Sequence, residues 1–213
     1  MNIEVVDDPA AAVADLLVQA DGHVVITGGS TPQRAYELAA GRRPDWGGVT
    51  IWFTDERCVP PDHELSNFAM ADRALFSRLE RPPKVMRMEG ELGYAAGTEA
   101  YEALVGDNPS FGLMILGLGP DAHIASLFPN KPEKHVDDRM VVGVPEAGME
   151  PYVPRISLTL PAINRAEQAV FLVTGANKQE AVQRAFGDEL DTESPGAHVR
   201  PVTVYLDAAA AGR

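Results

Sequence analysis

The sequence contains a single cysteine, Cys58, among its 213 residues. One cysteine cannot form an internal disulfide, so the chain differs from the small secreted proteins that disulfides hold together. We therefore expect a reducing compartment. Nothing near Cys58 indicates an activated thiolate, and we interpret this side chain as structural.

Long hydrophobic runs are also missing. No apolar stretch approaches the roughly 18 residues that a membrane-spanning helix requires. No lysine or arginine precedes Arg34, which argues against a signal or transit peptide. We expect a cytoplasmic protein with no membrane partner.

Positive charge is scarce, because 18 lysine and arginine residues are outnumbered by 31 aspartate and glutamate residues, giving a formal net charge of −13. Without a basic cluster, such a chain repels nucleic acid, and we expect no nucleic-acid partner. An anionic small substrate would have to be bound by a few well-placed cations. No His, Cys and carboxylate set has the spacing of metal ligands, so we predict no metal and no other cofactor.

The residues that are present suit one globular domain covering 1–213, with 45% hydrophobic and 23% charged residues. Apolar runs of strand length alternate with segments of helical period, which predicts an α/β fold with a mainly parallel sheet covered on both faces. We predict strands at 3–6, 23–27, 49–54, 111–117, 139–144, 155–160, 169–175 and 202–206, and helices at 9–20, 32–41, 67–79, 94–106 and 177–187.

Polar or glycine-rich residues follow four of the predicted strands. In open α/β sheets, ligands bind beyond the carboxyl ends of the strands. The four segments could therefore converge on one site. They are "GGSTP" (28–32), "DER" (55–57), "GLGPDAH" (117–123) and "ANK" (176–178).

Asp121 and His123 are the main candidates for chemistry, because they follow the strongly apolar strand 111–116. His123 could be a structural residue or a general base, and Asp121 could fix its tautomer or bind a substrate hydroxyl. Asp55 and Arg57 also follow a strand. This charged turn could be merely solvated, or Arg57 could bind a phosphate or a developing oxyanion.

A phosphate site is the second candidate. Gly28, Gly29, Ser30 and Thr31 could form a plain helix start, or a cradle in which backbone N–H groups bind an anion. Lys178 lies in the first turn of a predicted helix, where the macrodipole disfavours a cation unless an anion binds beside it. Arg155 is a further candidate cation.

"GLGPDA" (117–122) also matches the dinucleotide fingerprint G-x-G-x-x-G/A. That motif requires a full crossover helix directly after it, and "HIASLFP" allows barely two helical turns before Pro129. The Pro120 ring also occupies the loop where the backbone should approach a pyrophosphate. We reject a dinucleotide site.

The order of several segments resembles that of the 6-phosphogluconolactonase family. They are "GGSTP" (28–32), "DERCVPPDHELSN" (55–67), "GLGPDAHIASLFP" (117–129), "PRISLTLPAIN" (154–164), "FLVTGANK" (171–178) and "LDAAAA" (206–211). The resemblance implies a three-layer α/β/α fold, like that of glucosamine-6-phosphate deaminase and ribose-5-phosphate isomerase. It also implies a metal-free hydrolase of a sugar-phosphate lactone in the oxidative pentose phosphate pathway.

The resemblance also implies roles for individual residues. His123 matches the family's general base and Arg57 its active-site arginine. The 28–31 loop, Arg155 and Lys178 match its sugar-phosphate contacts. The oligomeric state stays open between a monomer and a small homo-oligomer.

Two rival functions remain on the same fold. A sugar-phosphate deaminase or isomerase would resemble "DEY" where this chain has "DER", and its histidine loop would lack "ASLFP". A catalytically silent sugar-phosphate sensor would normally carry a DNA-binding segment, for which 213 residues leave no room.

The family usually has glycine where this chain has Ala122. We expect right-handed or extended backbone there, because a left-handed alanine would be strained and nothing in the sequence indicates how that strain is offset.

Overall fold

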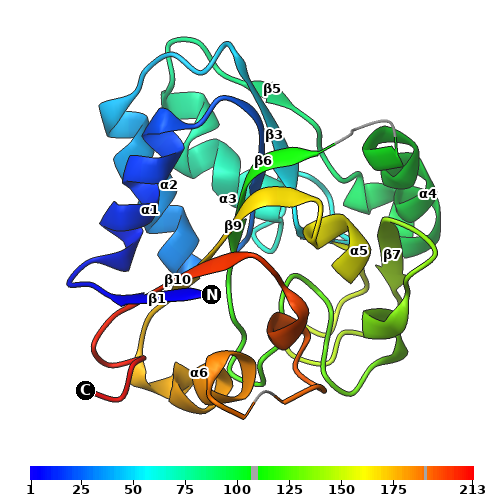
Figure 1. Ribbon diagram of the computed structural model, residues 1–213. Helices are drawn as coiled ribbons and strands as arrows, with labels where there is room; N and C mark the ends of the chain where they lie inside the picture. The colour runs from blue at the N-terminus through cyan, green and yellow to red at the C-terminus, as the bar shows by residue number, and fades with distance from the viewer. Residues whose placement is uncertain (107–109, 190) are drawn as a thin grey trace.

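The computed structural model describes residues 1–106, 110–189 and 191–213. Its central feature is a parallel sheet of seven strands in the order β1-β10-β9-β6-β2-β3-β5 (Figure 1). The strands are β1 (Asn2–Val5), β2 (Gly22–Ile26), β3 (Val49–Phe53), β5 (Lys84–Val85), β6 (Phe111–Leu116), β9 (Ala166–Val173) and β10 (Val202–Leu206).

Helices cover both faces of this sheet, which confirms the predicted three-layer α/β/α architecture. α1, α2 and α3 lie together on one side, and α4 and α5 lie on the other (Figure 1). The helices are α1 (Pro9–Gln19), α2 (Ser30–Arg42), α3 (Asn67–Ala74), α4 (Gly93–Gly106), α5 (Leu160–Ile163) and α6 (Gln179–Phe186). No described helix is long and apolar enough to cross a membrane.

The middle strands are apolar along nearly their whole length because both of their faces are covered. In β6, every residue except Gly112 is buried, and the last five residues of β9 are buried as well. These strands belong to one large hydrophobic cluster with the inner sides of the helices. The sheet is therefore a rigid platform from which loops emerge at its carboxyl edge.

Two predicted strands belong to a different sheet. Segments 139–144 and 155–160 form β7 (Val141–Val144) and β8 (Arg155–Leu158), which pair antiparallel in a three-stranded sheet with β4 (Asp55–Arg57). The expectation that "DER" is a loop was wrong.

Thr54 joins the two sheets. Its N–H donates to the carbonyl of Ile26 in the large sheet (2.9 Å), and its carbonyl accepts from the N–H of Leu158 in the small one (2.8 Å). The chain thus passes from one sheet to the other through a single residue that pairs with both. This crossing brings β4 and β8 over the carboxyl edge of the parallel strands.

Smaller differences concern the ends of elements. The predicted helix 67–79 stops at Ala74 and continues as a 3-10 turn, Phe76–Arg78. The predicted helix 177–187 begins at Gln179, after a 3-10 turn at Ala176–Lys178. The short strand β5 and helix α5 were not predicted, because two and four residues carry too little periodicity.

The backbone at Ala122 is left-handed, with φ 70°. The expectation of a right-handed or extended residue was therefore wrong. Ala122 is completely buried, its N–H donates to the carbonyl of Gly119 (3.0 Å), and its carbonyl accepts from Ser194 Oγ (3.3 Å). Contacts on both sides of the residue thus hold a conformation that costs an alanine roughly 1–2 kcal/mol.

Ala122→Gly should change the free energy of unfolding by less than about 1 kcal/mol. The relief of roughly 1–2 kcal/mol of strain is offset by about 0.5–1 kcal/mol of unfolded-state entropy and about 0.8 kcal/mol for the buried methyl group. Ala39→Gly is the matched control, because Ala39 is equally buried but lies within α2. Urea unfolding of both variants measures the difference. Equal destabilisation of the two would contradict a strained Ala122.

Candidate active site

The loops after β2, β6 and β9, together with β4 beyond β3, surround one cavity of about 490 Å³. Its volume lies in the range typical of small-molecule sites. Asp121 contacts this site through His123 and is not part of its lining. The other predicted site residues line the cavity: Gly28, Gly29, Ser30, Thr31, Asp55, Arg57, His123, Arg155 and Lys178.

His123 and Asp121 form a close pair. His123 Nδ1 lies 2.5 Å from Asp121 Oδ1, and the backbone N–H of His123 donates to the same oxygen (3.2 Å). Burial raises the pKa of Asp121, but the hydrogen bonds and the charge of His123 outweigh it, so the net pKa lies below the ordinary value. An ionised carboxylate can only accept, so in the neutral imidazole the proton is on Nδ1 and the lone pair is on Nε2.

The turn that carries this pair is tightly enclosed. The N–H of Gly119 donates to the carbonyl of His123 (2.8 Å), which closes the loop. A Cβ at position 119 would lie 2.0 Å from His123 Nδ1 and 2.7 Å from Asp121 Oδ1. On its other side the imidazole packs against Phe128, with ring centroids 4.8 Å apart. The ring is therefore fixed in orientation as well as in tautomer.

Only some of the guanidinium donors of Arg57 and Arg155 form hydrogen bonds within the protein. Arg57 Nη1 donates to the carbonyl of Leu65 (2.6 Å), and Arg155 Nη2 donates to the carbonyls of Met149 and Pro151 (3.0 Å each). The Nε of each guanidinium is buried, and no described residue accepts a hydrogen bond from it. Both side chains line the cavity, so an anion bound there would meet two guanidinium charges.

Lys178 and the start of α2 lie on the same side of the cavity. Thr31 Oγ1 and Thr174 Oγ1 are hydrogen-bonded at 2.8 Å, which joins the amino end of α2 to the chain just after β9. Lys178 Nζ donates to the carbonyl of Leu118 (2.7 Å). Burial lowers the pKa of Lys178, and the charge of Asp121 opposes this effect. An anion here would meet a helix amino terminus and an ammonium group together.

Gly28 and Gly29, which precede α2, could not be replaced by larger residues, each for a different reason. Gly29 has φ 115°, a conformation that L side chains rarely adopt. At Gly28, an added Cβ would lie 2.0 Å from Asn67 Oδ1. Asn67 in turn donates from Nδ2 to the carbonyl of Asp55 (2.8 Å). The glycine loop is therefore packed directly against the β4 segment.

Asp55 is buried and its carboxylate is largely occupied. Oδ2 accepts from Ser126 Oγ (2.7 Å), and Oδ1 accepts from Thr54 Oγ1 (2.9 Å). Burial lowers the pKa of Arg155, and the nearby charge of Asp55 opposes this effect. The structure thus places the buried side chain of Asp55 close to Arg155. Among the described residues, no group of three or more His, Cys, Asp and Glu side chains is arranged to hold a metal ion.

The side chain of Glu56 links the "DER" segment to the "SN" segment that follows it in the chain. Its carboxylate accepts from the backbone N–H groups of Asn67 (2.7 Å) and Phe68 (2.8 Å) and from Ser66 Oγ (2.9 Å). It therefore caps α3, and Ser66 Oγ adds a second cap by accepting from Ala69 N (3.1 Å). Burial raises the pKa of Glu56, while these hydrogen bonds oppose the rise. The neighbouring Cys58 is half-buried, and burial raises the pKa of its thiol to about 11.

A sequence profile of the family described as glucosamine-6-phosphate isomerases/6-phosphogluconolactonase matches residues 3–207. The chain belongs to this family.

Individual members of the family are similar over most of the chain. The 6-phosphogluconolactonase of Nostoc sp. strain PCC 7120 is 31% identical over 98% of this chain and 96% of its own. The human 6-phosphogluconolactonase is 36% identical over 76% of this chain and 67% of its own. The solved structure of 6-phosphogluconolactonase from Thermotoga maritima superposes with a TM-score of 0.84 at 32% identity, covering 97% and 98% of the two chains. A monomeric glucosamine-6-phosphate deaminase with a TM-score of 0.84 is 18% identical, which shows the shared fold.

Some cavity residues of this family member were not predicted. Asn67, Thr174 and Asn177 all lie within quoted motifs, so all three had a local signal. Glu150 had none that a single sequence provides. This residue comes from the segment between β7 and β8, whose place over the cavity depends on the second sheet.

Gly119→Ala should lower kcat by roughly 100-fold or more, because the new methyl group must displace either His123 or Asp121, and general acid–base groups contribute about 10²–10⁴-fold. Gly112→Ala is the control, since a Cβ there makes an ordinary 3.6 Å contact with the carbonyl of His23. Steady-state kinetics of both variants on the family's lactone substrate measures the effect. Normal turnover by Gly119→Ala would show that the pair is not needed in this geometry.

Proposed function

We propose that the protein hydrolyses 6-phosphogluconolactone to 6-phosphogluconate, with His123 as general base. The observation that carries this proposal is the His123–Asp121 pair at the wall of a cavity that also holds Arg57, Arg155 and Lys178. A δ-lactone is an activated ester. Water and a positioned base are therefore sufficient, and no covalent enzyme intermediate is required.

In the proposed reaction, water attacks C1 of the lactone while Nε2 of His123 accepts one of its protons. The carbonyl oxygen becomes an oxyanion, and Arg57, which lines the cavity, stabilises it with its positive charge. Collapse of the tetrahedral intermediate breaks the bond between C1 and the ring oxygen. His123 returns its proton to that oxygen, and the product leaves as a carboxylic acid that ionises in water.

The phosphate is proposed to bind between the start of α2 and Lys178. The hydrogen bond between Thr31 and Thr174 supports this placement, because it shows that the two segments adjoin. Arg155 supplies a further buried positive charge at the cavity wall. Binding of the remote phosphate would convert its interaction energy into correct placement of C1.

The test compares two reactions. Freshly prepared 6-phosphogluconolactone should release acid much faster with the protein than without it, as followed by a pH indicator. Glucosamine 6-phosphate should release no ammonia above the background rate. Ammonia release without lactone hydrolysis would instead indicate a deaminase, and neither reaction would indicate a sugar-phosphate sensor.

A further inference from the structure

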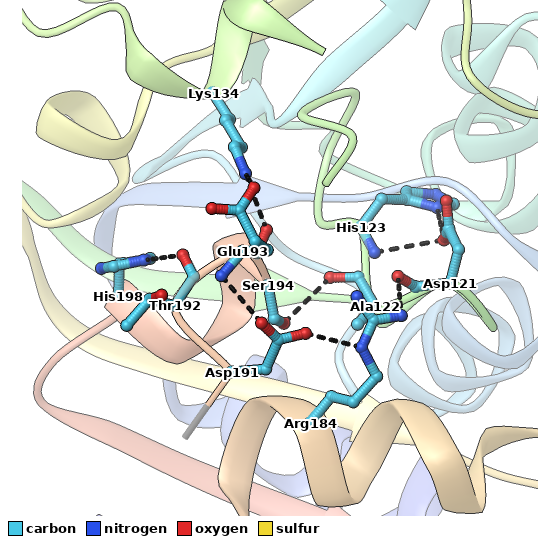
Figure 2. Close-up of polar contacts among 10 residues, drawn as sticks. All are labelled: Asp121, Ala122, His123, Lys134, Arg184, Asp191, Thr192, Glu193, Ser194 and His198. Atoms are coloured by element: carbon cyan, nitrogen blue, oxygen red, sulfur yellow. Dashed lines mark hydrogen bonds and ion pairs between the residues drawn. The ribbon is translucent and has the colours of Figure 1, made fainter. Parts of the chain in front are cut away.

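Arg184 lies on α6 and is not part of the cavity lining, yet its guanidinium reaches the backbone of the His123 turn (Figure 2). Its Nη1 donates to the carbonyl of Asp121 (3.0 Å). Its Nε donates to Asp191 Oδ2 (2.8 Å), so the guanidinium is fixed from a second direction. A charge-assisted donor held in this way defines where the Asp121 carbonyl points.

Ser194 holds the next carbonyl of the same turn. Its buried Oγ donates to the carbonyl of Ala122 (3.3 Å), and its N–H donates to the carbonyl of Asp191 (2.9 Å). The segment that carries Asp191 and Ser194 is itself anchored by an ion pair between Lys134 and Glu193 (Figure 2). Two successive carbonyls of the turn therefore receive donors from outside it.

The two hydrogen bonds are accepted by the carbonyls before and after the Cα of Ala122, whose backbone conformation aligns His123 with Asp121. The left-handed conformation of Ala122 returns the chain on itself, so that the carboxylate of Asp121 meets the imidazole two residues later. An alanine does not adopt this conformation without support from its surroundings. If the 121 and 122 carbonyls lost their donors, the peptide groups on both sides of Ala122 could rotate toward an ordinary conformation.

We propose that Arg184, held by Asp191, is a positioning residue that keeps the Asp121–Ala122–His123 turn in the conformation needed for proton transfer. This inference rests on the proposed function of His123. The side chains of Arg184 and Asp191 remain about one-third exposed, so a structural role in the core does not account for the pair. Arg184 acts on the reaction through the backbone and does not touch the substrate.

Arg184→Met keeps the aliphatic part of the side chain and removes both donors. Its kcat on 6-phosphogluconolactone should fall about 10- to 100-fold, because small misplacements of a catalytic group have effects of this size. KM and inhibition by 6-phosphogluconate should stay within about 3-fold, since the groups that line the cavity are unchanged. Arg184→Lys should recover part of the loss.

Arg42→Met, which removes an exposed Arg–Asp pair of similar length between α2 and α1, is the control with normal kinetics. An unchanged kcat in Arg184→Met, or a parallel rise in KM, would overturn the proposal.

A double-mutant cycle with Ala122→Gly separates positioning from a general loss of structure. Glycine adopts the left-handed conformation without strain, so the turn then depends less on the hydrogen bonds from Arg184 and Ser194. Arg184→Met should therefore cost several-fold less kcat in the Ala122→Gly background than in the wild-type background. Equal fold losses in the two backgrounds would count against the proposal.

A spectroscopic readout keeps this test independent of the lactonase activity. The imidazole ¹⁵N and Nδ1 proton signals of His123, assigned by their loss in His123→Asn, report the bond to Asp121. They should shift in Arg184→Met and remain in Arg42→Met. If the wild-type protein fails to hydrolyse the lactone, the proposed function fails, while unchanged imidazole signals in Arg184→Met would refute the positioning role itself.

Discussion

His123→Asn should remove nearly all lactone hydrolysis and leave binding of 6-phosphogluconate within a few fold. Asparagine retains a polar group near the position of Nδ1 but provides no base at the position of Nε2. General-base catalysis contributes about 10²–10⁴-fold, so kcat should fall by that factor. Product binding should persist, because the proposed phosphate contacts lie on α2 and at Lys178.

Asp121→Asn is the informative companion to His123→Asn. The amide cannot enforce protonation of Nδ1, since it can either donate or accept at this site. Its kcat should therefore fall by less than that of His123→Asn, with KM again unchanged. Initial rates with fresh lactone and competition by 6-phosphogluconate measure both variants. Near-normal kcat in His123→Asn would exclude the histidine as the base.

Lys178→Met should weaken capture of the phosphorylated lactone by roughly 10- to 150-fold, the equivalent of about 1.5–3 kcal/mol for a charge-assisted hydrogen bond. Hydrolysis of unphosphorylated gluconolactone should change little, because methionine fills a similar volume and His123 is untouched. The measurement is kcat/KM for the two lactones with each protein. Equal losses on both substrates would show that Lys178 does not recognise the phosphate.

The same lysine also gives the binding step a pH dependence. Because burial lowers its pKa in the folded protein, Lys178 loses its proton at a lower pH than an unfolded lysine does. Affinity for the phosphorylated lactone should therefore decline on the alkaline side before an ordinary lysine would titrate. The charged form also destabilises the empty protein below that pKa, and this cost declines as the pH rises from the folded pKa to that of an unfolded lysine. Lys178→Met should accordingly raise the unfolding temperature at neutral pH.

The sequence predicted the larger sheet and the position of the cavity because both follow from strong local patterns. Buried parallel strands are continuous apolar runs, and the segments after them are rich in glycine and charge. The role of Glu56 could not be predicted, because a carboxylate between Asp55 and Arg57 looks like part of the same charged turn. Only the antiparallel pairing of β4 shows that its side chain faces away from its two neighbours and caps α3.

Tertiary contacts also decided the conformation of Ala122. Local preference favours right-handed or extended backbone for an alanine. Arg184 and Ser194, which are 62 and 72 residues away along the chain, supply the donors that favour the other conformation. Likewise, Arg155 appeared as an isolated cation in the sequence. Its place beside Asp55 depends on the crossing at Thr54.

The hydrogen bond between Thr31 and Thr174 joins residues 143 positions apart. A cavity closed in this way does not exist in a fragment that ends before β9, since β2 and β9 lie on opposite sides of β6 and are placed there by the parallel crossovers. During synthesis from the amino terminus, the residues of α2 and β4 that line the cavity are therefore present long before the binding site forms. Lactone hydrolysis becomes possible only once the last third of the chain has folded onto the first.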